Sequence, residues 1–148
     1  MTNREKINWL KRYIWLDREI TAKLTECEQL RAKLGKITPT LSFQPPGGGS
    51  IHKSTDHDLI NRITDLESSM NKNIDTLIII RAEIEQVIML QENDQERLLL
   101  HHRYIDGKTW IQVCVLMNYK WAQTHRIHSN ALKNLNMIQN DTSIRDII

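Results

Sequence analysis

The sequence is poor in cysteine, which argues against a fold that depends on disulfides. Its 148 residues include two cysteines, Cys27 and Cys114, which lie far apart in the chain. Each falls on the apolar face of a predicted helix, where a free thiol packs as a small hydrophobic group. We therefore expect buried, reduced thiols rather than a disulfide or a redox pair.

Long apolar runs are also absent. Runs such as "LIII" at 77–80 and "LLL" at 98–100 are far shorter than the roughly 20 residues of a membrane span. The first segment, "MTNREKINWLKRYIW", lacks the apolar core of a signal peptide. We therefore expect a cytoplasmic protein that does not interact with a membrane.

Proline and glycine are concentrated in a single stretch, "TPTLSFQPPGGGS" at 38–50, which holds all three prolines and three of the five glycines. Strands would require alternating apolar and polar residues, and no such alternation occurs. The sequence therefore predicts an all-α protein with one long connecting loop.

Apolar residues recur at steps of three and four on both sides of this stretch, which is the spacing of one helix face. Gly35 can end the first helix, and Ser54, Thr55 or Asp56 can cap the second. The loop is therefore predicted at 35–54, with no role assigned to it. The two stripes are Tyr13, Leu16, Ile20, Leu24, Cys27, Leu30 and Leu34, and then Leu59, Ile63, Leu66, Met70, Leu77, Ile80, Ile84 and Val87 or Ile88.

Helices of this length, about 45–55 Å, cannot bury such a stripe alone. They either fold back on each other as a coiled-coil-like antiparallel hairpin or pair with another chain. The segment "DTLIIIRAEI" is apolar on more than one side, which indicates a further contact with a second copy, with the carboxyl-terminal part, or within a wider core of the same chain. We predict a helical hairpin over residues 1–91 and a homo-oligomer, with a dimer favoured.

Three shorter helices are predicted over residues 92–136, followed by a tail at 137–148. Asn93-Asp94 can cap the first, "QERLLLHHRYI". Asp106-Gly107 then signals a turn, because glycine readily adopts a positive φ.

The second and third of these helices are separated by another turn. Thr109 and Gln112 have the spacing of a capping box at the start of the second, which should end near Met117. Asn118 can adopt the left-handed conformation at its end. The last helix should run from Lys120 to about residue 136.

Projection at 100° per residue separates an inner from an outer face on both helices. Trp110, Val113, Cys114 and Met117 should face inward on the first, and Thr124, Ile127, Ala131 and Leu135 on the second. Ala122, His125, Arg126, Ser129 and Lys133 should face outward, with Trp121 and Gln123 on the flanks. This is the layout of a helix-turn-helix with an exposed recognition helix.

Charge supports a nucleic-acid partner only through its distribution, because the net charge is just +2. Residues 100–135 carry five basic side chains and one acidic one, a net charge of +4, whereas residues 1–91 are close to neutral. Positive charge near the carboxyl end can bind phosphates. Arginine and glutamine can also form paired hydrogen bonds with guanine and adenine.

The stretch "RYIDGKTWIQVCVLMNYKWAQTHRIHSNALKNL" resembles the region-four helix-turn-helix of bacterial sigma factors. Its "RYIDGKTW" entry and "RIHSNALKNL" exit look especially like the phage-encoded ArpU/RinA-type transcriptional regulators, as do long helices joined by a loop such as "FQPPGGGS". The resemblance implies a late-gene activator in the bacterial host cell, which binds double-stranded promoter DNA and engages host RNA polymerase. The long amino-terminal helices would then serve oligomerisation or polymerase contact.

On this resemblance, the base-reading positions are Trp121, Ala122, His125 and Arg126. Lys120 and Lys133 would approach phosphates, and Arg103 and Lys108 would add positive charge. With Gln123 and Ser129 from the outer face, the predicted DNA-binding set is Arg103, Lys108, Lys120, Trp121, Ala122, Gln123, His125, Arg126, Ser129 and Lys133.

Several positions depart from the sigma-factor pattern. Lys120 occupies the slot where such helices usually start with Ser or Thr, so the helix lacks a side-chain cap. Ile111, Val115 and Leu116 replace acidic or polar residues, which makes the surface unusually apolar. An alternative function is therefore a protein-interaction module that uses this surface to bind a partner such as RNA polymerase, without specific DNA reading.

No catalytic or cofactor site is predicted. "GGGSIHKS" at 47–54 approaches a phosphate-binding loop, but His52 replaces its second glycine and no strand precedes it. The histidines at 101–102, 125 and 128 lack the further ligands of a zinc site. No arrangement of a nucleophile with a base, and no carboxylate pair, is recognisable, so we do not expect an enzyme.

Overall fold

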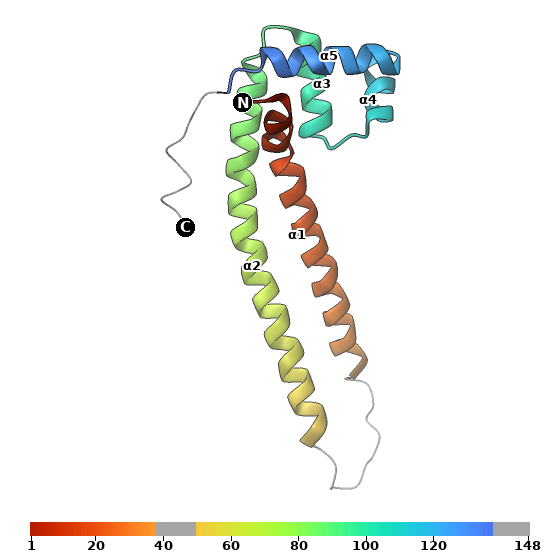
Figure 1. The fold of residues 1–148 in the computed structure, drawn as a ribbon. Coiled ribbons are helices and arrows are strands. Elements are labelled where there is room, and N and C mark those ends of the chain that lie inside the picture. Colours follow the sequence, from red (N-terminus) through yellow and green to blue (C-terminus); the bar gives the residue numbers. More distant parts are fainter. Residues whose placement is uncertain (38–49, 138–148) are drawn as a thin grey trace. The chain divides into compact units, whose positions relative to one another are not determined.

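A computed structural model describes residues 1–37 and 50–137, and within these ranges all regular secondary structure is helical (Figure 1). The predicted all-α class is confirmed. No described helix combines the length and apolar composition needed to cross a membrane. The helices are α1 (Asn3–Ile37), α2 (Ser50–Met89), α3 (Asp94–Tyr104), α4 (Trp110–Met117) and α5 (Trp121–Asn134).

The described chain forms two compact units whose boundaries lie inside the long helices. One unit is Leu16–Ile78, and the other combines Met1–Trp15 with the residues from Ile79 onward. The first turns of α1 and the last turns of α2 therefore belong with the three short helices. The sequence predicts a division near residue 91, just after the end of α2 at Met89.

The unit Leu16–Ile78 is an antiparallel pair of helices, in agreement with the predicted hairpin. Cys27 of α1 packs with Leu66 and Met70 of α2, and Leu30 lies against this cluster. Arg62 pairs with Glu26 at 3.0 Å. Cys27 is a free, buried thiol as predicted, whereas Cys114 is only partly buried.

The ends of the two long helices differ from the prediction. Gly35 lies inside α1, which continues to Ile37, and α2 already begins at Ser50. One glycine costs a helix only about 1 kcal/mol, so it does not enforce an end. The predicted caps at 54–56 are thus helical positions, and the rest of the predicted loop, 38–49, lies outside the described residues, as does the tail at 138–148.

Most predicted stripe positions are at least partly buried, but Leu24 is exposed. The apolar segment 77–80 also leaves Ile78 and Ile79 exposed, while Ile80 is buried. Spacing alone predicts which residues share a face, and it does not determine how much of that face a partner helix covers.

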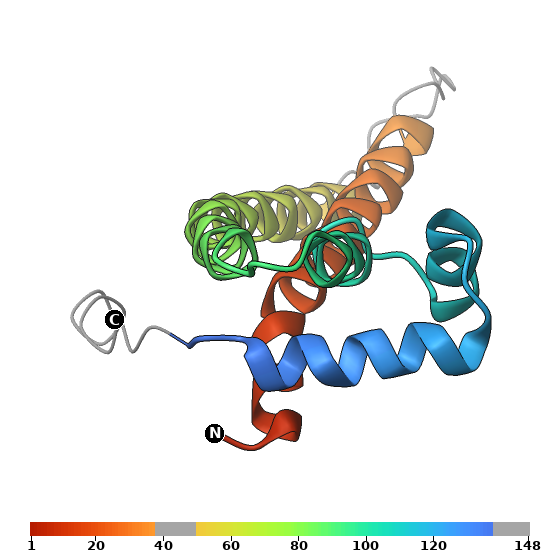
Figure 2. The ribbon, with the colours of Figure 1, turned by 90° about the horizontal axis from the view of Figure 1, so that it is seen from above.

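The second unit has its core where the long helices end. Figure 2 shows α2 and α3 viewed nearly along their axes, with α5 running across the view. Asn93 caps α3 as predicted, because its side-chain oxygen accepts from the backbone N–H of Gln95 at 2.9 Å. The large side chains that are fully buried in this unit are Leu10, Ile84, Ile88, Leu99, Leu100, Tyr104, Val113 and Thr124.

Replacing Leu99 by alanine should destabilise the protein by about 2–5 kcal/mol, because it leaves a cavity in this core. Its neighbour Leu98, which is 47% exposed, provides a matched control with the same chemical change. Leu98→Ala should cost less than about 1 kcal/mol. Urea denaturation followed by circular dichroism compares the two variants. Equal losses in the free energy of unfolding would contradict this description of the core.

Candidate nucleic-acid interface

The start of α4 has the predicted geometry. Gly107 adopts a φ of 68°. Thr109 and Gln112 form a capping box: the hydroxyl of Thr109 accepts from the N–H of Gln112 at 3.3 Å, and the Gln112 side chain accepts from the N–H of Thr109 at 2.9 Å. These bonds satisfy two N–H groups that the helix cannot pair itself, so the start of α4 is defined locally.

The turn between α4 and α5 contains three residues, Asn118 to Lys120. Asn118 has the left-handed conformation expected of it, with φ 56° and ψ 41°. The N–H of Tyr119 donates to the carbonyl of Cys114 at 3.1 Å, which closes the end of α4. Lys120 precedes α5 and forms no side-chain capping bond, as its lysine side chain predicts.

Contacts from α1, from α3 and from the segment between α2 and α3 hold the carboxyl end of α5. The ammonium group of Lys6 donates to the carbonyls of Leu132 and Leu135 at 2.6 and 3.1 Å. The side-chain amide of Gln91, just after α2, donates to the carbonyl of Ala131 at 2.8 Å. Asn134 donates to both carboxylate oxygens of Glu96 in α3, at 3.2 and 3.1 Å.

The buried face of α5 differs partly from the projection. Thr124, Ala131 and Leu135 are buried as predicted, but Ile127 is only half-buried. Leu132 and His128 are buried instead. The core side of α5 is therefore rotated slightly from the predicted one, towards His128 and Leu132.

Seven of the ten predicted DNA-binding residues are exposed. They lie on α5 or just before it, and four of them share one face because they fall within 60° of each other in projection at 100° per residue. These four are Ala122, Arg126, Ser129 and Lys133, and the other three are Lys120, Trp121 and Gln123.

The remaining three, Arg103, Lys108 and His125, are half-buried. The guanidinium of Arg103 lies 4.9 Å from the centre of the Trp110 ring and donates to the carbonyl of Lys108 at 2.7 Å. Arg103 therefore links the end of α3 to α4 and holds its charge against an aromatic face. Sequence reasoning did not detect this structural role, because Trp110 and Lys108 become neighbours of Arg103 only after the chain turns at Gly107.

His125 was predicted to face outward, but its side chain is half-buried. Its ring lies between Trp110 and Trp121, with centroid distances of 4.5 and 4.4 Å. Its Nε2 is buried, and no hydrogen-bond partner for this atom occurs among the described residues. The projection was wrong because it gives a direction from the helix axis, whereas the two tryptophan rings determine how far the imidazole is covered.

His128 lies deeper, 2.9 Å from the hydroxyl of Tyr104 through its Nε2, and Trp110 meets its ring edge-on. Burial, and then the nearby charges of His125 and Arg103, lower the pKa of His128 to about 4. Burial also raises the pKa of Tyr104 to about 12. Both groups are therefore neutral at physiological pH. The sequence contained one sign of the burial of His128. It lies four residues after the inward-facing Thr124, so the two side chains share one side of the helix.

Three of the four exposed side chains of α4 are aliphatic, and the fourth is Gln112. Ile111 and Val115, one turn apart, are 70% and 74% exposed, and Leu116 is 52% exposed. Trp121, at the start of α5, is 55% exposed. We call Ile111, Val115 and Leu116 the α4 apolar face.

The described residues hold no group of three or more His, Cys, Asp or Glu side chains arranged to bind a metal ion. Comparison of the chain with models of protein families, with curated proteins and with solved structures gives no match. The function must therefore be inferred from the residues and their geometry.

Acidification should destabilise the protein through His128. The unfolded chain takes up this proton near the usual pKa of 6.5, whereas the folded chain takes it up only near 4. The free energy of unfolding therefore keeps the full contribution of neutral His128 above about pH 6.5. It decreases by up to about 3 kcal/mol as the pH falls towards about 4. Urea denaturation at a series of pH values in this window measures the loss.

The variant His128→Gln should show a shallower dependence on pH, because it removes the titrating group from the core. The matched control is His57→Gln, at an exposed position of α2, which should keep the wild-type dependence. An unchanged pH dependence in His128→Gln would show that other groups are responsible.

Proposed function

We propose that the protein is a DNA-binding transcriptional regulator of the phage ArpU/RinA type, in which α5 enters the major groove of double-stranded DNA. In this proposal α4 crosses the DNA backbone, as the first helix of a helix-turn-helix does. Host RNA polymerase is the proposed second partner, and the long helices serve oligomerisation or polymerase contact.

The observation that carries the proposal is the charge of the exposed surface around α5. From Gly107 to Met137 the chain has four basic residues and no aspartate or glutamate. Three of these, Lys120, Arg126 and Lys133, are exposed. A surface without carboxylates can approach phosphates without repulsion, and a generic solvent-exposed helix usually carries both signs.

The exposed face of α5 also bears groups suited to read base edges. Arg126 can bind guanine through two hydrogen bonds and Gln123 can bind adenine in the same way, while Ala122 can contact a thymine methyl group. Ser129 and Lys133, further along the helix, suit phosphate contacts. Trp121 is exposed next to them, whereas the partly covered His125 is better suited to hold Trp121 in place than to read bases.

The short turn and the firmly held carboxyl end of α5 support the same proposal. A recognition helix must be presented rigidly, because a hydrogen bond to a base tolerates little displacement. Residues 103–135 resemble sigma region four over their full length, which adds independent support from the sequence.

Replacing Arg126 by alanine should weaken binding to a preferred sequence, selected from a random DNA pool, by about 1–3 kcal/mol, or roughly 5- to 150-fold. The salt dependence of DNA binding should stay nearly unchanged in this variant, because a base contact releases no counterion. Lys133→Ala should instead weaken binding to all sequences and reduce the slope of log K against log salt by about one. Fluorescence anisotropy titrations across salt measure both, and absence of DNA binding at low salt would overturn the proposal.

The α4 apolar face favours a second candidate function, a protein-interaction module that binds RNA polymerase through this surface. Three large aliphatic side chains on one short helix are costly to leave in water and often mark a contact surface. DNA phosphates offer them no favourable interaction, so this face suits a protein partner even if α5 binds DNA.

The variant Val115→Glu should abolish capture of the protein by purified bacterial RNA polymerase, because a carboxylate in an apolar contact loses its hydration. DNA affinity and helical content should not change. Gln95→Glu places the same charge at an exposed position in the first turn of α3, away from the α4 apolar face, so it should retain capture. Equal capture by all three proteins would exclude the α4 apolar face as the polymerase contact.

A further inference from the structure

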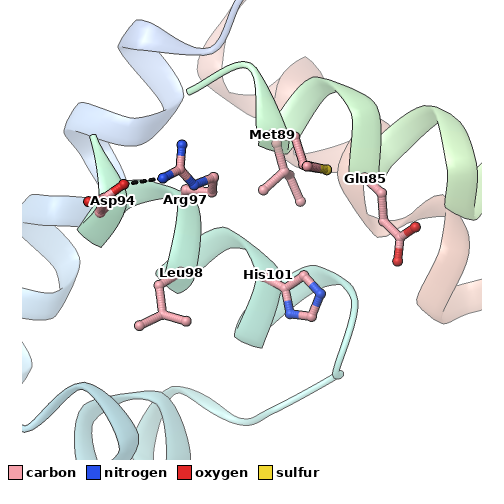
Figure 3. A pocket seen from close by; sticks show the side chains of 7 residues that line it. Glu85, Met89, Asp94, Arg97, Leu98 and His101 are labelled. Carbon is pink, nitrogen blue, oxygen red and sulfur yellow. Dashed lines mark hydrogen bonds and ion pairs between the residues drawn. The ribbon is translucent and has the colours of Figure 1, made fainter. Parts of the chain in front are cut away.

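The last turns of α2 and the helix α3 enclose an open groove that neither the predicted interface nor the α4 apolar face includes. Its volume is about 630 Å³, and it is lined by Glu85, Ile88, Met89, Asp94, Arg97, Leu98 and His101. Figure 3 shows these side chains arising from the two neighbouring helices. None of the lining residues belongs to α4 or α5.

Apolar side chains form the floor of the groove and also protrude beside it. Ile88 is buried at the bottom, whereas Met89 is 73% exposed and Leu98 is 47% exposed. The same surface therefore combines a hollow with two protruding apolar side chains. Methionine is flexible and polarisable, so Met89 can adapt to a partner surface.

The charges at the groove's edge are balanced within the chain itself. Glu85 accepts from Arg81 at 2.9 Å, and Asp94 pairs with Arg97 (Figure 3). Nδ1 of His101 lies 3.3 Å from a carboxylate oxygen of Asp106. A strongly acidic partner, a nucleic acid or an anionic lipid surface therefore meets no uncompensated positive charge here.

We propose that this groove binds the same groove of a second copy of the chain, around a two-fold axis. Such a contact uses one patch twice, so the patch must be complementary to itself. A hollow beside protruding Met89 and Leu98, with both signs of charge at the edge, meets this requirement. An apolar centre within a polar rim is also the usual composition of a protein interface.

The groove and the exposed face of α5 share no residue, so the dimer leaves the α5 side chains that are proposed to contact DNA accessible. The proposal stands on the groove alone and does not rest on DNA binding. If both hold, the dimer supplies two recognition helices, as pseudo-palindromic sites require.

Size-exclusion chromatography with light scattering, in the absence of DNA, tests the dimer on the full chain. At roughly 100 µM, where an interface of micromolar affinity is nearly saturated, the mass should approach twice the 17.4 kDa of one chain. Leu98→Glu should raise the dimer dissociation constant by about tenfold or more, because the contact would bury an unpaired carboxylate. Met89→Glu should act in the same direction.

The matched control is Ile111→Glu, which places the same charge on another exposed aliphatic position of the same compact unit. This variant should dimerise like the wild type. Circular dichroism checks that each variant keeps its helical content, and a folded Leu98→Glu chain whose dimer dissociates at a higher concentration than the wild-type dimer, in a dilution series, supports the proposal.

Cross-linking locates the axis. In a chain carrying Cys114→Ala, where the remaining Cys27 is buried, the variant Leu98→Cys should form a covalent dimer with a short bismaleimide. Residues near a two-fold axis meet their own copies, so Ile111→Cys in the same background should cross-link much less.

A monomeric full chain at this concentration would overturn the proposal, whether the groove is then empty or covered by residues 138–148. It would equally be overturned by a dimer that persists in both groove variants and is lost in Ile78→Glu, because the contact would then lie on the long helices. Neither outcome depends on DNA affinity, so failure here is distinguishable from failure of the proposed function.

Discussion

The last turn of an α-helix leaves carbonyl groups that the helix itself cannot pair, and in α5 these carbonyls are bound by the rest of the protein. Lys6 from the amino terminus and Gln91 from the end of α2 donate to carbonyls between Ala131 and Leu135, while Asn134 binds Glu96 of α3. Segments distant in sequence thus converge on one helix end. The direction of α5, and hence which of its side chains reach solvent, depends on this convergence.

The amino-terminal half of α5 is held by aromatic packing rather than by such hydrogen bonds. His125 lies between Trp110 and Trp121, and His128 reaches Tyr104 of α3. Burial of the His128 imidazole disfavours its charged form and lowers its pKa, so this half is most stable when His128 is neutral. One end of α5 is thereby fixed by charge-assisted and amide hydrogen bonds, and the other by aromatic packing around His125 and His128.

Three exposed surfaces of this unit differ in chemistry, and the difference separates their proposed partners. The α5 face is basic and polar and has no carboxylate, which suits nucleic acid. The α4 apolar face is aliphatic, which suits a protein. The groove of α2 and α3 is apolar with balanced charge, which suits a second copy. A regulator that binds DNA, a partner protein and itself needs separate surfaces, because occupation of one must leave the others accessible.

Much of this structure could be predicted from the sequence, because it depends on local chemistry. The positive φ of Gly107, the capping box of Thr109 and Gln112 and the left-handed Asn118 depend on neighbours within a few residues, so the ends of α4 could be predicted closely. The all-helical class and most of the buried stripes followed from periodicity. Tertiary structure alone decided that His125 is covered and that Arg103 binds Trp110 and the carbonyl of Lys108. Those contacts depend on how α3, α4 and α5 approach one another, and a spacing along the chain carries no information about that approach.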